Sequence, residues 1–75
     1  MAGVRDPSVA GFGRNVKAAR VERGWTQEQL ADETGLASVQ VSRVERGERE
    51  VRLTTVLRLL RALDVAPDAL LKDLL

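Results

Sequence analysis

Cysteine and histidine are absent from this 75-residue chain, and its only aromatic residues are Phe12 and Trp25. Without cysteine or histidine the chain can form no disulfide, no zinc site built on those residues and no Ser-His or Cys-His catalytic pair. Two aromatic side chains are too few for the stacking surfaces of RNA-recognition and single-strand-binding folds. We therefore expect a protein that is not an enzyme and that uses no metal and no cofactor.

Long apolar runs are also missing. No stretch approaches the roughly 18 consecutive apolar residues of a membrane span, and no apolar run near Met1 resembles a signal peptide. We expect no membrane association and a cytoplasmic location. The length is close to the lower limit for independent folding and predicts one small domain, without a second domain to sense a ligand. No small-molecule ligand is evident from the sequence.

Basic charge is unevenly distributed, although the net charge is only +1. Ten of the twelve basic residues are arginine, and six of these fall within residues 43–61: Arg43, Arg46, Arg49, Arg52, Arg58 and Arg61. Residues 26–35 hold three acids and no base. Local arginine clusters are typical of nucleic-acid contact surfaces, and they are also typical of solvated helix faces. Charge alone leaves both interpretations open.

Hydrophobic spacing predicts five short helices and no strand. Apolar residues at helical intervals indicate a first helix over 11–23, and Thr26 with Gln29 forms a capping box for a second helix that stops at Gly35. Further helices are predicted over 36–46, 53–63 and 67–75, the last beginning at a proline. We expect residues 1–10 to be a flexible lead-in, and residues 11–75 to form an all-α bundle.

The second and third predicted helices have the layout of a DNA-binding helix-turn-helix, with a glycine turn between two short helices. The sequence reads GWTQEQLA over 24–31, GL over 35–36 and VSRVERG over 41–47, followed by a leucine-rich stretch from Leu57 to Val65. These segments resemble the lambda-repressor-like helix-turn-helix family over about residues 11–71. That family includes phage repressors and Cro proteins, xenobiotic-response-element regulators and the controller proteins of restriction-modification systems. The segment from Glu45 to Arg49 is most similar to the controller proteins.

The resemblance implies a set of DNA contacts. The positions that face the bases in this family are Ser38, Val39, Gln40 and Arg43. The positions implied to contact the phosphate backbone are Gln27, Arg46, Arg49, Arg52 and Arg14. Arg43 has the donors to bind guanine O6 and N7, Gln40 suits adenine or a phosphate, and Val39 suits a thymine methyl group. Acidic Glu48 and Glu50 lie among the implied phosphate contacts, and an alternative is that they pair with those arginines.

Arg20 and Glu45 match positions at which the family pairs an arginine of the first helix with a glutamate of the third. The resemblance therefore implies a structural ion pair at these two residues rather than contact with DNA. Such a pair, when partly buried, fixes the orientation of its helices more than it adds stability.

The predicted helix caps depart from the family pattern at two positions. Ala37 stands where a serine or threonine commonly caps the recognition helix, and Arg52 stands where a small residue often opens the fourth helix. Each missing cap costs about 1 kcal/mol. Ser38 and Thr54 are alternative caps, and capping would divert Ser38 from base reading.

The C-terminal leucines predict a dimer. Leu70, Leu71, Leu74 and Leu75 cover an arc of about 140° on the last predicted helix, which is wider than a small core needs. We expect Leu70 and Leu74 to close the core. The residues expected at a symmetric interface are Leu71, Leu75 and Leu59.

The function predicted from these features is transcriptional regulation, for example as a repressor. The chain is expected to bind an inverted-repeat operator in double-stranded DNA as a homodimer, through the major groove. A protein-interaction module, such as the antitoxin of a toxin-antitoxin pair, is the alternative function. A toxin or RNA polymerase stays open as a further partner.

Overall fold

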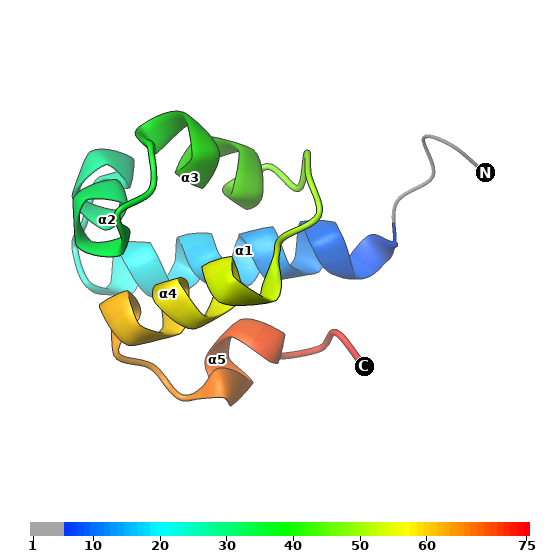
Figure 1. Ribbon diagram of the computed structural model, residues 1–75. Coiled ribbons are helices and arrows are strands. Elements are labelled where there is room, and N and C mark those ends of the chain that lie inside the picture. The colour runs from blue at the N-terminus through cyan, green and yellow to red at the C-terminus, as the bar shows by residue number, and fades with distance from the viewer. Residues whose placement is uncertain (1–5) are drawn as a thin grey trace.

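The computed structural model describes residues 6–75, which form five α-helices and no strand. The helices are α1 (Pro7–Glu22), α2 (Gln27–Thr34), α3 (Ser38–Glu45), α4 (Leu53–Leu63) and α5 (Pro67–Leu71). The predicted all-α bundle is therefore confirmed. Figure 1 shows α3 at one end of the molecule and α5 at the other, with α1 and α4 between them. None of these five helices combines the length and the apolar composition needed to traverse a bilayer.

The first helix begins earlier than its apolar spacing predicts. Asp6 is the N-cap, and its Oδ1 atom accepts a hydrogen bond from the Ser8 amide at 2.9 Å, while Pro7 occupies the first turn. Proline is tolerated there because an amide hydrogen at that position would have no partner within the helix. The predicted lead-in over 1–10 is wrong for residues 7–10, which are helical. Residues 1–5 lie outside the described part of the chain.

The hydrophobic core takes side chains from all five helices. Its buried members are Phe12, Val16, Leu30, Ala31, Val41, Val44, Leu59, Leu63 and Leu70. Burial of one such leucine contributes about 1.5–3 kcal/mol relative to leaving it in water. Leu59 is only 1% exposed, because it lies one helical turn before Leu63 on the inward side of α4. Its expected place at a dimer interface is therefore wrong, since its own protomer already covers it.

Helices α1 and α3 pack closely at Gly13. A Cβ atom at this position would lie 2.2 Å from the carbonyl oxygen of Val44 and 2.8 Å from that of Glu45. Both distances are shorter than van der Waals contact allows. This packing therefore requires glycine, which has no side chain, at position 13. The C-terminal end of α3 is thereby seated directly on the backbone of α1.

The last helix ends at Leu71, so the prediction of a helix over 67–75 is too long. Asn15 of α1 donates from Nδ2 to the carbonyl oxygens of Leu70 at 2.8 Å and of Lys72 at 3.0 Å. The chain then turns at Asp73, whose φ is 63°. The carbonyls that would continue the helix are bound by a side chain of α1, and this contact holds the C-terminal segment against the bundle.

Candidate nucleic-acid interface

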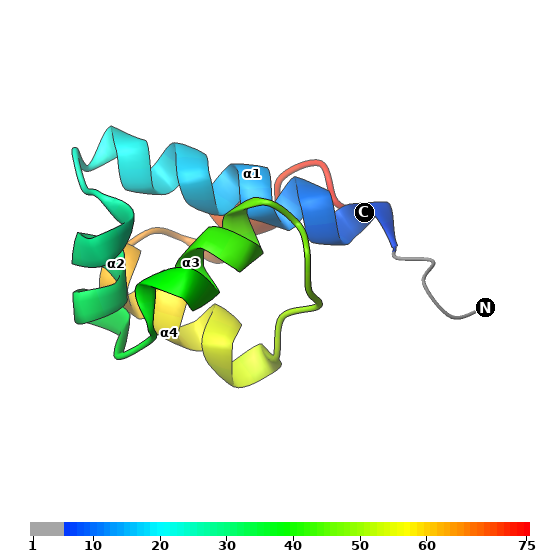
Figure 2. The same cartoon turned by 90° about the horizontal axis from the view of Figure 1, so that it is seen from above.

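Helices α2 and α3 form a helix-turn-helix. The first of them ends at Gly35, whose φ of 76° is in the left-handed region and whose amide donates to the carbonyl of Ala31. Glycine adopts this conformation without steric cost, and it allows the chain to turn within two residues before α3 begins. Seen from above in Figure 2, no other helix lies over α3 on this face. The second helix of the motif is therefore the outermost element of this side.

The outward side of α3 carries the residues expected to read bases. Ser38, Val39 and Gln40 are exposed in its first turn, and Arg43 is half-buried one turn further on. Val39 is 51% exposed, which makes it an apolar contact point among polar neighbours. The opposite side of the helix is buried against the core through Val41 and Val44. The structure thus brings the four expected base-reading residues onto one accessible helix.

Neither of the alternative caps forms in this structure. Ala37 is itself the N-cap residue of α3, and Arg52 is the N-cap residue of α4, and neither provides a side-chain hydrogen bond to its helix. Ser38 is the first residue inside α3, and Thr54 is the second inside α4. Capping therefore does not divert the hydroxyl group of Ser38.

Gln40 performs a capping function that sequence reasoning missed. Its Oε1 atom accepts a hydrogen bond from the backbone amide of Ala37 at 2.9 Å. Gln29 makes the same contact in α2, where its Oε1 atom accepts from the Thr26 amide at 2.7 Å. The signal was present, because a glutamine three residues after an N-cap has capping-box spacing even when the cap residue is alanine. The amide oxygen of Gln40 is thereby occupied, and its Nε2 donors stay available.

A buried carboxylate joins the three helices around the motif. Glu45, 8% exposed, accepts hydrogen bonds from Arg20 Nε at 2.6 Å, from Arg20 Nη2 at 3.0 Å and from Gln27 Nε2 at 3.1 Å. Arg20 also donates from Nη1 to the carbonyl of Trp25 at 2.7 Å. The hydrogen bonds that Arg20 donates to Glu45 raise the pKa of Arg20, so its charge is retained despite its partial burial. The ion pair implied between Arg20 and Glu45 is present.

Gln27 is tied to this network more closely than sequence reasoning indicated. It is half-buried in the first turn of α2, and one of its amide hydrogens is engaged by Glu45 of α3. Sequence spacing gave no signal for this contact, because the two residues are eighteen positions apart. Gln27 therefore braces α3 directly. The second hydrogen of its Nε2 group stays available to donate to an external acceptor.

The arginines after α3 differ in their surroundings. Arg46 forms an exposed ion pair with Glu48, with 2.7 Å between Nε and Oε2. Arg49 and Arg52 are exposed in the connection to α4, and Arg14 is exposed on α1. Within residues 6–75 no ion pair engages these three. Among residues 6–75, the alternative that Glu48 and Glu50 pair with these arginines therefore holds only for Arg46 with Glu48.

The chain matches a known protein family. A helix-turn-helix family model matches residues 16–70, and the chain belongs to the lambda-repressor-like helix-turn-helix family. The family consists of transcription regulators. The matched range runs from the core side chain Val16 of α1 to the core side chain Leu70 of α5, so it includes both helices of the motif and the packing that positions them.

Individual relatives agree with this family. The chain is 40% identical over 57 residues to a hypothetical transcription factor of Neisseria meningitidis, covering 76% of this chain and 54% of that protein. It spans about half the length of the relatives that it matches in sequence. The fold is similar to the restriction-modification controller protein C.AhdI from Aeromonas hydrophila, with a TM-score of 0.81, 39% identity and coverage of 85% of this chain and 97% of that one.

A second controller protein, C.Esp1396I, has been solved as a tetramer in complex with its natural 35 base-pair operator. The present structure matches that chain with a TM-score of 0.79 and 25% identity, covering 89% of this chain and 88% of that one. The similarity to both controller proteins agrees with the resemblance of the segment from Glu45 to Arg49 to the controller proteins.

Proposed function

We propose that this protein is a sequence-specific regulator of transcription that binds an inverted-repeat operator in double-stranded DNA as a homodimer, in the cytoplasm. The observation that carries the proposal is the accessible first turn of α3, held rigidly to α1 and α2 by the buried Glu45 carboxylate. A helix presented in this way fits the major groove, where base edges have distinct donor and acceptor patterns.

Base reading is assigned to the outward side of α3. Arg43 has the paired donors that recognise guanine O6 and N7, and Val39 offers apolar contact to a thymine methyl group. Because the Oε1 atom of Gln40 is bound to the Ala37 amide, Gln40 approaches DNA as a donor. It therefore favours acceptors such as guanine O6, thymine O4 or a phosphate over the two-point contact with adenine. Ser38, free of a capping role, is assigned a short polar contact.

Backbone contacts are assigned to five residues around this helix: Gln27, Arg46, Arg49, Arg52 and Arg14. Such contacts position a protein on the duplex without reading sequence. Each one releases condensed counterions, so affinity falls steeply as salt rises. The net charge of one subunit is only +1, and the second subunit of a dimer doubles the number of these contacts.

The dimer surface is assigned to exposed leucines at the end of the molecule away from α3. Leu71 is 46% exposed and Leu75 is fully exposed, as expected from the sequence. A two-fold axis is the commonest dimer symmetry, and reading two half-sites one turn of DNA apart requires recognition helices about 34 Å apart. The operator complex of C.Esp1396I supports an oligomeric assembly on DNA.

Electrophoretic mobility shift with sheared genomic DNA at low and high salt tests the proposal. We expect retarded complexes at low salt that weaken steeply as salt is raised. Arg43→Ala should weaken complexes with preferred fragments, whereas Arg61→Ala, an equal loss of charge at an exposed site on α4, should not. Absence of any shift at low salt would contradict DNA binding and favour the antitoxin-type interaction module.

A further inference from the structure

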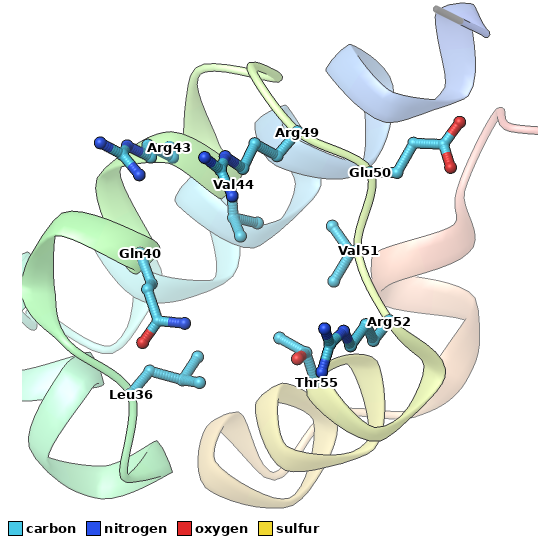
Figure 3. Close-up of a pocket in the computed structure, with 9 residues that line it drawn as sticks. All are labelled: Leu36, Gln40, Arg43, Val44, Arg49, Glu50, Val51, Arg52 and Thr55. Carbon is cyan, nitrogen blue, oxygen red and sulfur yellow. The ribbon is translucent and has the colours of Figure 1, made fainter.

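A hollow lies between α3, the connection that follows it and the first turn of α4 (Figure 3). Its volume is about 280 Å³, enough for a small organic molecule. Leu36, Val44 and Val51 form an apolar floor. The hollow borders the proposed DNA-binding helix, and its floor offers apolar surface that a phosphate group alone does not cover.

The polar side chains around this floor are mainly donors. Figure 3 shows Arg49 reaching from the connection toward α3 and Arg52 turning toward Thr55, whereas the side chain of Arg43 extends away from the floor. Glu50, the one carboxylate of the lining, points away from the hollow. In the described part of the chain no ion pair occupies any of these three arginines, although Arg46 beside them is paired. Their positive charge is left to an external partner.

Gln40 adds a donor whose direction is fixed by its capping bond. Because Oε1 accepts from the Ala37 amide at 2.9 Å, the Nε2 group is the free end of the side chain. In Figure 3 this nitrogen is directed toward the hollow above Leu36. The capping contact therefore orients Gln40 as a hydrogen-bond donor to a ligand.

The start of α4 makes the same end of the hollow more electropositive. Its N-cap, Arg52, provides no side-chain hydrogen bond to the helix, and Thr55 of the first turn lines the hollow. The amides of an eleven-residue helix present a partial positive charge at this end, which favours an anion. The arginines, the glutamine and the helix end thus act on one region from three separate segments of the chain.

We infer that this hollow binds a small organic phosphate ester. Arg49, Arg52 and Gln40 donate to the phosphate, and the organic group covers the apolar floor. Guanidinium forks match phosphate oxygens in geometry as well as in charge. Because Gln40 and Arg43 also belong to the proposed DNA-reading surface, an occupied hollow competes with DNA. That regulatory consequence rests on the proposed function, whereas binding of the ester does not.

Phenyl phosphate and inorganic phosphate are suitable probes, followed by ¹H–¹⁵N NMR of the whole chain. We expect saturable shifts in the amides of Val44, Val51 and Thr55. Phenyl phosphate should bind about tenfold more tightly than inorganic phosphate, since its ring covers roughly 60 Å² of apolar surface. Phenol, which lacks the charge, should bind weakly. Equal affinities for phenyl phosphate and inorganic phosphate would overturn the inference. The hollow would then bind only a phosphate group, such as one of the DNA backbone.

The decisive variant is Gln40→Glu. Glutamate keeps an oxygen for the Ala37 amide, so the cap and the fold are retained, but it directs negative charge at the hollow. We expect at least a tenfold loss of phenyl phosphate affinity with unchanged thermal stability. Gln29→Glu is the matched control, because Gln29 has the same capping position in α2 and does not line the hollow. Equal losses in both variants, or no loss in either, would overturn the assignment.

Competition with DNA separates this inference from the proposed function. We expect phenyl phosphate to displace labelled genomic DNA from the wild-type protein. It should displace much less DNA from the Gln40→Glu variant, after the comparison is corrected for that variant's own affinity for DNA. If DNA binds but phenyl phosphate neither binds nor competes, the inference fails and the proposed function stands. If phenyl phosphate binds but DNA does not, the proposed function fails and the ligand site stands.

Discussion

Gln27 of α2 donates its amide hydrogen to Glu45 of α3 at 3.1 Å, on the same carboxylate that holds Arg20 of α1. One buried carboxylate therefore fixes the two helices of the motif relative to each other and to the longest helix. A recognition helix reads bases only if its register on DNA is reproducible, and phosphate contacts set that register. The Gln27–Glu45 contact joins a candidate phosphate-binding residue to the proposed recognition helix.

Removing this carboxylate should destabilise the protein strongly. Glu45→Ala leaves Arg20, with 11% side-chain exposure, charged and without its acidic partner. We predict a loss of about 3–5 kcal/mol in the free energy of unfolding, measured by urea denaturation followed by circular dichroism. Glu48→Ala breaks the exposed pair with Arg46 and should cost at most about 1 kcal/mol. Similar costs for the two variants would show that Glu45 has no special structural role.

Gly13→Ala tests the close packing of α1 on α3. In an ordinary helix this substitution stabilises by about 1 kcal/mol, because alanine has the higher helix propensity. Here the new methyl group would meet the carbonyl oxygens of Val44 and Glu45. We predict destabilisation by about 1–3 kcal/mol through overpacking. Lys17→Ala, at an exposed position of the same helix, should stay within about 0.5 kcal/mol of wild type. A more stable Gly13→Ala protein would contradict the observed helix contact.

Local sequence signals were sufficient for most of the fold. The Thr26 capping box and Gly35 correctly bounded α2, because both act through atoms only a few residues away. The ends of the chain were predicted less well. No apolar spacing indicates a helix over residues 7–10, although Asp6 caps a helix that begins at Pro7. The end of α5 depends on Asn15, more than fifty residues away, and no local pattern reveals such a contact.

The candidate site, like the fold, could be predicted only in part from the sequence. The resemblance placed the polar turn of α3 on the surface and the ion pair of Glu45 in the interior, and the side-chain contacts of Gln27 and Gln40 required coordinates. Leu59 was misplaced because leucines recur on two sides of α4, and periodicity alone does not say which side faces the core. The hollow beside α3 is likewise invisible in sequence, since its lining comes from separate segments.

Arg49 and Arg46 should affect the salt dependence of DNA binding differently. Arg49→Ala should reduce the slope of log K against log salt by about one unit, with similar losses on specific and random DNA. Arg46 is paired with Glu48, so Glu48→Gln should release it and strengthen binding to both DNAs. Binding titrations over a range of salt concentrations measure these effects, with Arg61→Ala as the control. A change limited to the preference at one base pair would contradict the backbone assignment.

Leu71→Asp tests the dimer surface. We predict that the wild type sediments as a dimer at micromolar concentration and that Leu71→Asp sediments as a monomer with an intact fold, because the new charge is exposed in the monomer and buried in the dimer. Val21→Asp is the matched control, since Val21 is 57% exposed on α1 and lies outside the assigned surface. Dimers that survive Leu71→Asp, or a monomeric wild type, would show that the interface is wrongly placed.

Selection of binding sites from random double-stranded DNA, with wild type and Arg43→Ala in parallel, tests the central claim most directly. We predict that the wild type enriches an inverted repeat whose half-site centres lie about 10 base pairs apart, with a fixed guanine in each half. Arg43→Ala should lose the preference for that guanine and bind the selected site about 1–3 kcal/mol more weakly. Failure of the wild type to enrich any motif, or an unchanged guanine preference in Arg43→Ala, would contradict the assignment of α3 as the base-reading helix.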